Sequence, residues 1–135
     1  MAQPFLDINI LLRHLLADHP DQSPRATAFL EHVERGEMRV HTAELVVFET
    51  VFTLERTYKR AKADIAAVLL PLIELPGVLL PGKRLFRAAF DLYVRHNLPF
   101  ADAYFAAWMQ HKGLSEIVCF DRDFDRVPGI TRREP

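Results

Sequence analysis

The sequence contains two short runs that end in the same way, Phe5-Leu6-Asp7 and Ile117-Val118-Cys119-Phe120-Asp121. Each run is apolar, has the length of a short strand and stops at an aspartate. Short apolar runs that alternate with longer helical patterns predict parallel strands joined by helices, which is an α/β fold. Because ligands of open α/β sheets bind beyond the carboxyl ends of the strands, both aspartates are expected to face such a crevice.

The pattern around these runs predicts the other elements of a parallel sheet with four to five short strands. Strands are expected at 4–6, 38–41, 78–80 and 117–120, with a fifth around Ile130-Thr131, and helices at 9–16, 24–35, 43–59, 63–75, 83–96 and 100–112. Ser23 and Thr42 are side chains that can cap the amino ends of two of these helices.

Length and composition indicate one ordinary globular domain over residues 1–135. The net charge of −1 gives no overall basic field that would announce a nucleic-acid partner. The lone Cys119 excludes an internal disulfide and is expected to pack as a small hydrophobe. Polar residues interrupt the first apolar stretch, and the apolar run 65–73 is too short to span a bilayer. No membrane association is therefore expected, and the predicted location is the cytoplasm.

Several acidic residues have sequence contexts that suggest metal ligands, although each also has a structural explanation. Asp7 could simply be a helix cap. Asp102 could simply be a first-turn acid whose charge interacts favourably with the helix dipole. Glu49 has Leu45, Val46 and Phe52 as helical neighbours, which predicts a partly buried carboxylate that needs a partner or a metal. Glu44 and Glu55 also have apolar neighbours, and the acids from Asp121 to Asp125 could form a solvated turn, so these alternatives stay open.

Convergence of three or four of these carboxylates would require a cation. Two unit charges about 4 Å apart repel by about 4 kcal/mol at an effective dielectric near 20. Oxygen ligands without sulfur favour Mg²⁺ or Mn²⁺. No two histidines lie three or four residues apart, which excludes a helical zinc pair, and the chain has no Gly-rich phosphate loop. A calcium loop starting at Asp121 fails, since Arg126 stands where Gly is required and Arg132 where Glu is required.

Four segments resemble, in order, the motifs of PIN-domain nucleases. These are Phe5-Leu6-Asp7-Ile8-Asn9, the segment from Thr42 to Phe52 that carries Glu49, Phe100-Ala101-Asp102-Ala103-Tyr104-Phe105-Ala106-Ala107, and Cys119-Phe120-Asp121-Arg122-Asp123-Phe124. Together they cover nearly the whole chain. The family usually has Thr or Ser at the position of Cys119, so a hydroxyl that supports the site is replaced here by a thiol.

The resemblance implies a three-layer α/β/α fold and Mg²⁺- or Mn²⁺-dependent hydrolysis of RNA phosphodiester bonds. It assigns the catalytic, metal-binding acids to Asp7, Glu49, Asp102 and Asp121, with Asp123 as a further metal ligand. The strand-end position favours Asp121 over Asp123 as the principal ligand. Substrate contacts are expected from Asn9 and Arg13.

Small single-domain members of this family are mostly VapC-type toxins. The resemblance therefore also implies a homodimer and a cognate antitoxin protein as partner. Two other functions fit the same acids: a PIN-like module that acts only by binding, and a metal-dependent phosphohydrolase of small phosphoesters.

Overall fold

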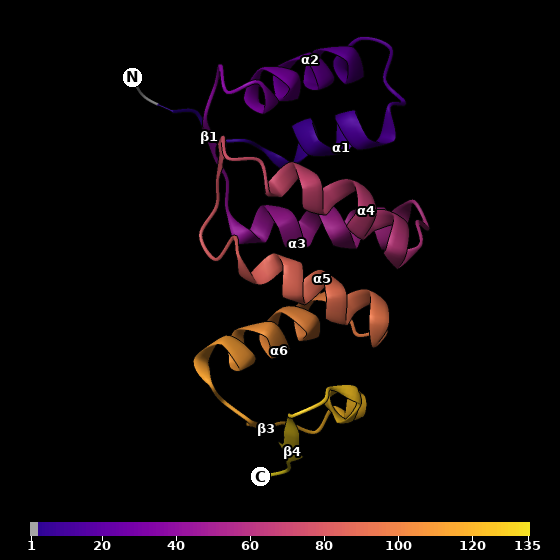
Figure 1. Cartoon of the computed structure of the whole chain (residues 1–135). Coiled ribbons are helices and arrows are strands. Elements are labelled where there is room, and N and C mark those ends of the chain that lie inside the picture. The colour runs from indigo at the N-terminus through magenta and orange to yellow at the C-terminus, as the bar shows by residue number, and fades with distance from the viewer. Residues whose placement is uncertain (1–2) are drawn as a thin grey trace. The chain divides into compact units, whose positions relative to one another are not determined.

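The computed structural model describes residues 3–135, which divide into two compact units. The first unit ends at Lys83 and the second is Arg84–Pro135. Each contains helices and a pair of parallel strands (Figure 1). Over the described residues, the helices are too short or too polar to cross a membrane.

The first unit follows the predicted alternation of helices and strands. Its elements in order are α1 (Ile8–Leu16), α2 (Gln22–Glu34), β1 (Val40–His41), α3 (Glu44–Phe52), the π-helical turn η1 (Thr53–Thr57), α4 (Lys62–Ile73) and β2 (Val78–Leu79). Strand β1 is parallel to β2, with Val40 opposite Val78. The expected strand at 4–6 contributes a single parallel bridge from Phe5 to His41.

Both predicted helix caps in this unit are wrong. Ser23 lies inside α2, and its hydroxyl accepts a hydrogen bond from the backbone of His19 at 3.1 Å. The amino end of α2 is satisfied by the imidazole of His19, whose Nδ1 accepts from the backbone N–H of Gln22 at 2.9 Å. Thr42 instead donates its hydroxyl proton to the carbonyl of Leu6 at 3.1 Å. It therefore ties the segment that precedes Asp7 to the end of β1.

The core of the first unit is aliphatic and comes from the apolar faces of its helices. Leu11, Val47 and Leu69 are almost completely buried. Helix α1 packs against both α2 and α3 (Figure 1). Gly77 is required by packing: a Cβ there would lie 2.9 Å from the carbonyl oxygen of Met38. The strand pair at the end of α4 depends on this close approach of two backbones.

The second unit is two helices followed by a short strand pair. Its elements are α5 (Leu85–Arg95), α6 (Phe100–Lys112), β3 (Glu116–Val118), the 3₁₀ helix η2 (Arg122–Arg126) and β4 (Thr131–Arg133). Helices α5 and α6 pack side by side, and β3 runs parallel to β4 (Figure 1). The expected fifth strand is thus confirmed as β4.

Aromatic side chains form the core between α5 and α6. The Phe100 ring lies 4.8 Å from the Phe90 ring and 5.3 Å from the Tyr93 ring, centroid to centroid. The Phe86 ring belongs to the same cluster and lies 5.1 Å from the Tyr104 ring, centroid to centroid. Aromatic pairs at such separations each contribute about 1 kcal/mol beyond the burial of their area. This cluster fixes the first turn of α6, which carries Asp102.

The α/β class predicted from the sequence agrees with this architecture. All five predicted strand segments take part in parallel pairing, but within residues 3–135 the hydrogen bonds join them in two groups. Phe5, β1 and β2 form one group, and β3 and β4 form the other. One continuous sheet of four to five strands stays a prediction.

Candidate metal centre

Asp102 sits in the first turn of α6, where the predicted helix begins as expected at Phe100. Phe100 is buried in the aromatic cluster, and Ala103 and Ala106 are fully buried on the same helix. Small residues on this face allow close packing of the helix on its neighbours. The carboxyl group of Asp102 is therefore half-buried and held by a rigid element.

Asp121 and Asp123 lie at the start of η2, which packs against α6. Strand β3 ends at Val118, so the prediction that Asp121 directly follows the strand is wrong by two residues. The Asp121 carboxylate caps η2 and accepts from the backbone N–H of Asp123 at 2.9 Å. Phe124 is buried and anchors the turn. The local order of this acidic turn thus comes from a cap and an apolar anchor.

Asp102, Asp121 and Asp123 form an acidic trio in the second unit. Each offers one carboxylate oxygen, and these oxygens all lie within 4.8 Å of one another. Two oxygens on opposite sides of one Mg²⁺ are about 4.2 Å apart, because each bond is about 2.1 Å long. Oxygens within 4.8 Å of one another are close enough to become ligands of a single ion. Three hard oxygen donors without sulfur or nitrogen fit Mg²⁺ or Mn²⁺.

Electrostatics within the acidic trio act mainly on Asp102. Burial raises the pKa of its carboxyl group, and the charges of Asp121 and Asp123, together with a hydrogen bond to Asp121, raise the pKa further. Arg126 opposes this effect and lies 2.8 Å from the Asp123 carboxylate. One arginine leaves the trio with net negative charge. A divalent cation would relieve the repulsion that raises the pKa.

The first unit carries the other two predicted acids, Asp7 and Glu49. Asp7 is exposed and caps α1, accepting from the backbone N–H of Asn9 at 3.4 Å. Glu49 is on α3, as predicted, but it is exposed, so the expected partial burial is wrong. The reason is that Leu45, one turn earlier on the same face, is itself 65% exposed. An apolar neighbour in sequence does not bury a carboxylate when that neighbour faces solvent.

The two predicted substrate contacts, Asn9 and Arg13, lie on α1 after Asp7. The Arg13 Nε donates to the Gln22 amide oxygen at 2.9 Å, and its Nη1 lies 3.7 Å from the Asp18 carboxylate. Asn9 is exposed at the start of the helix. Both residues line one groove of the first unit.

Two residues near the acidic trio make contacts that were not predicted from the sequence. Arg126 counted only as a misfit to a calcium loop, although its i,i+3 spacing from Asp123 is the signal for an ion pair on one helical turn. Cys119 is half-buried, and its Sγ donates to the Asp121 carbonyl at 3.5 Å. It is thus a weak donor to the acidic turn as well as a packing group.

Comparison with known proteins gives results that agree with this arrangement. A family model described as "PIN domain" matches residues 5–130. A VapC ribonuclease from Aquifex aeolicus (strain VF5) is 30% identical over 124 residues, which cover 90% of each chain. The family match includes every acid considered above. This protein therefore belongs to the PIN-domain family.

Proposed function

We propose that this protein is a Mg²⁺- or Mn²⁺-dependent endoribonuclease in which residues 1–135 act as one domain. The observation that carries the proposal is the acidic trio, whose three carboxylates lie close enough to share one hard cation. Family membership and similarity to a VapC ribonuclease support RNA as the substrate. The family match spans both compact units, which supports a single working domain with one sheet of four to five strands between helical layers.

The acidic trio would act as the metal ligands in this reaction. Asp102, Asp121 and Asp123 would bind the ion, and Asp7 and Glu49 are proposed to complete the site. When bound, the ion would polarise the scissile phosphate and lower the pKa of a water that attacks phosphorus. The positive charge of the ion would offset the repulsion from Asp121 and Asp123 that helps to raise the pKa of Asp102.

Supporting contacts would keep the acidic turn ready to bind. The backbone N–H of Asp123 holds the Asp121 carboxylate at 2.9 Å, and Arg126 holds the Asp123 carboxylate at 2.8 Å. These interactions reduce the number of positions that both carboxylates can adopt before the ion arrives. A site ordered in advance loses less conformational entropy on binding.

Cleavage of a fluorescent single-stranded RNA, with metal removed and then restored, tests the proposal. We expect no cleavage in EDTA and recovery with Mg²⁺ or Mn²⁺. Asp102→Asn should lower the rate at least about 100-fold, since even outer-shell partners of a metal contribute 10- to 100-fold. Asp91→Asn is the matched control, because Asp91 is an exposed helical aspartate that pairs with Arg95 one turn later. Equal rates for wild type and Asp102→Asn would contradict the catalytic assignment.

The same preparations distinguish the two alternative functions. Turnover of a chromogenic phosphomonoester that is lost in Asp121→Asn, without RNA cleavage, would indicate a small-molecule phosphohydrolase. A folded protein with no cleavage and no metal-dependent rise in melting temperature would indicate a binding module. Neither alternative is favoured by a specific contact among residues 3–135.

We also propose that the protein is the toxin of a toxin–antitoxin pair, forms a homodimer and acts in the cytoplasm. Similarity to a VapC ribonuclease supports the pairing. On α6, Phe105 and Trp108 are 52% and 42% exposed, which supports a protein-binding surface there. Light scattering of the purified chain should give the mass of two protomers. Co-expression with a short neighbouring gene product should restore the growth of cells that produce this chain.

A further inference from the structure

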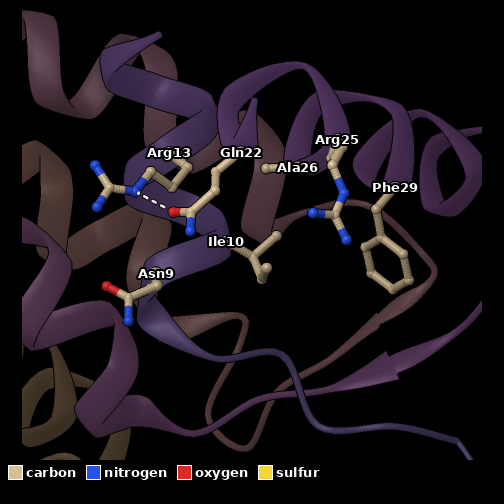
Figure 2. A pocket seen from close by; sticks show the side chains of 7 residues that line it. All are labelled: Asn9, Ile10, Arg13, Gln22, Arg25, Ala26 and Phe29. Carbon is tan, nitrogen blue, oxygen red and sulfur yellow. Dashed lines mark hydrogen bonds between the residues drawn. The ribbon is translucent and has the colours of Figure 1, made fainter. Parts of the chain in front are cut away.

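The first unit has a groove between α1 and α2, with a volume of about 610 Å³ (Figure 2). Side chains from both helices line it: Asn9, Ile10 and Arg13 from α1, and Gln22, Arg25, Ala26 and Phe29 from α2. Among these described lining residues two are cationic and none is acidic. The groove therefore suits an anion, although the chain as a whole has a net charge of −1.

The two arginines differ in how firmly they are held. Arg13 is oriented by its Nε hydrogen bond to Gln22, and its Nη1 lies 3.7 Å from the Asp18 carboxylate. The guanidinium group has five N–H donors, so it can still donate to a ligand. Arg25 pairs with Asp21 one turn earlier at 3.2 Å, and its side chain is 76% exposed. Exposed ion pairs with this spacing contribute little to stability. Arg25 can therefore exchange its partner for a phosphate at little cost.

Apolar groups lie between the two guanidinium groups. Figure 2 shows Ile10 and Ala26 between Arg13 on one side and Arg25 on the other. Phe29 follows Arg25 by four residues on the same face of α2, and its ring stands beside the Arg25 guanidinium in this view. Two cations separated by an apolar floor, with an aromatic ring at one end, match the alternation of phosphate and base along a nucleic-acid strand.

The groove also lies close to a proposed catalytic acid. Asn9 lines the groove. Its backbone N–H donates to the carboxylate of Asp7, which caps α1. A strand held in the groove would therefore have one end near the start of α1. Within the first unit, the groove therefore lies next to Asp7, which is proposed to complete the catalytic site.

We propose that the α1–α2 groove binds the flanking segment of a single-stranded RNA, with Arg13 and Arg25 on phosphates and Phe29 against a base. The inference rests on the proposed function for the identity of the strand as RNA. An acidic peptide would also satisfy the arginines, and its apolar side chains would contact the floor, so the test below separates a peptide from RNA. The charges and the ring together favour RNA.

Binding of a short fluorescent RNA in EDTA tests the groove separately from catalysis. Arg25→Gln should weaken binding about three- to tenfold, as expected for loss of one charge-assisted contact. The slope of log Kd against log salt should also fall by about 0.7, because one phosphate contact is lost. Arg95→Gln is the matched control: Arg95 pairs with Asp91 at 3.3 Å, also with i,i+4 spacing, and its side chain is 74% exposed.

Phe29→Leu tests the aromatic contact, because leucine keeps the residue apolar but removes the ring. We expect about fivefold weaker binding of RNA. For a strand of the same length with abasic positions, Phe29→Leu and wild type should bind equally, while Arg25→Gln should still bind more weakly. Circular dichroism of each variant confirms that it is folded.

Each outcome either supports or overturns the proposal that the groove binds RNA. Equal RNA affinity of Arg25→Gln and Arg95→Gln, or no RNA binding by wild type, would overturn it even if the enzyme cleaves RNA. Binding of an acidic peptide, but not of RNA, with the same dependence on Arg25 would reassign the groove to a protein. RNA binding with the expected dependence, but no cleavage with metal, would support the groove and reject the proposed catalysis.

Discussion

The acids of the second unit and those of the first unit occupy very different environments. Asp102 is half-buried, has two carboxylates beside it and has a raised pKa. Asp7 and Glu49 are exposed, and the recorded contact of Asp7 is a helix cap. Their sequence contexts gave no such distinction, because each of the three stands beside apolar residues. The comparison shows that apolar neighbours in the sequence predict neither the burial of a carboxylate nor its closeness to other acids.

The largest expected effect is a loss of RNA cleavage that tests whether the first unit supplies acids to the catalytic site. Asp7→Asn and Glu49→Gln should each lower RNA cleavage at least about 100-fold if both acids join the acidic trio around one site. Asparagine also caps helices well, so Asp7→Asn should leave the stability of α1 nearly unchanged.

Initial rates and melting temperatures of these two variants provide the measurement. Glu34→Gln, an exposed acid at the end of α2, is the control. Full activity of both variants would restrict the site to the second unit and sharpen the contrast. The melting curves separate a loss of activity from a loss of folding, because Asp7→Asn keeps the helix cap and removes only the charge.

The next effect concerns metal binding in the absence of substrate. At an ion concentration about 100 times Kd, Mn²⁺ should stabilise the folded protein by about 2.7 kcal/mol, which corresponds to several degrees in melting temperature. Asp102→Asn should lose most of this shift. Without metal, the same variant should melt higher than wild type, because one of three mutually repelling carboxylates has been neutralised. Thermal denaturation with and without EDTA checks both signs.

A smaller effect distinguishes the two acids of η2. Asp121→Asn should weaken Mn²⁺ binding about tenfold more than Asp123→Asn. The Asp123 carboxylate is already neutralised in part by the charged Arg126 at 2.8 Å, whereas Asp121 accepts from an uncharged backbone N–H at 2.9 Å. Calorimetric titration of each variant with Mn²⁺ measures the difference. The reverse order would make Asp123 the principal ligand and Asp121 chiefly a helix cap.

The smallest effect is a pH dependence in the first unit. Burial lowers the pKa of His14, with Glu31 acting against this effect, and its Nδ1 lies 2.8 Å from the Thr27 hydroxyl. The folded state therefore disfavours the protonated ring, so stability should fall as the pH drops through the ordinary value of 6.5 toward the lowered value. His14→Gln should flatten this part of the profile, measured by urea denaturation at several pH values. His111→Gln, an exposed histidine on α6, should leave it unchanged.

Much of the local structure could be predicted from the sequence. Among the described residues, helical periodicity and apolar runs located the α-helices and the strand segments to within a few residues, including β4, but not the 3₁₀ helix η2. The caps failed because His19 and Thr42 act through distant or unusual partners: the imidazole of His19 caps α2, and Thr42 bonds to Leu6 in another segment. The Thr42 partner depends on how distant segments meet, whereas His19 lies three residues before Gln22 and was missed because histidine is not among the usual capping residues.

By itself the sequence determined the α/β class, the order of the elements and the list of candidate acids, because these follow from short-range pattern and residue chemistry. Only the tertiary structure decided that Asp102, Asp121 and Asp123 lie close together, that Glu49 faces solvent, and that Arg25 and Phe29 line a groove with Arg13. The physical reason is that burial and electrostatic coupling depend on distance in space. The approach of α6 to η2, and of α1 to α2, sets those distances.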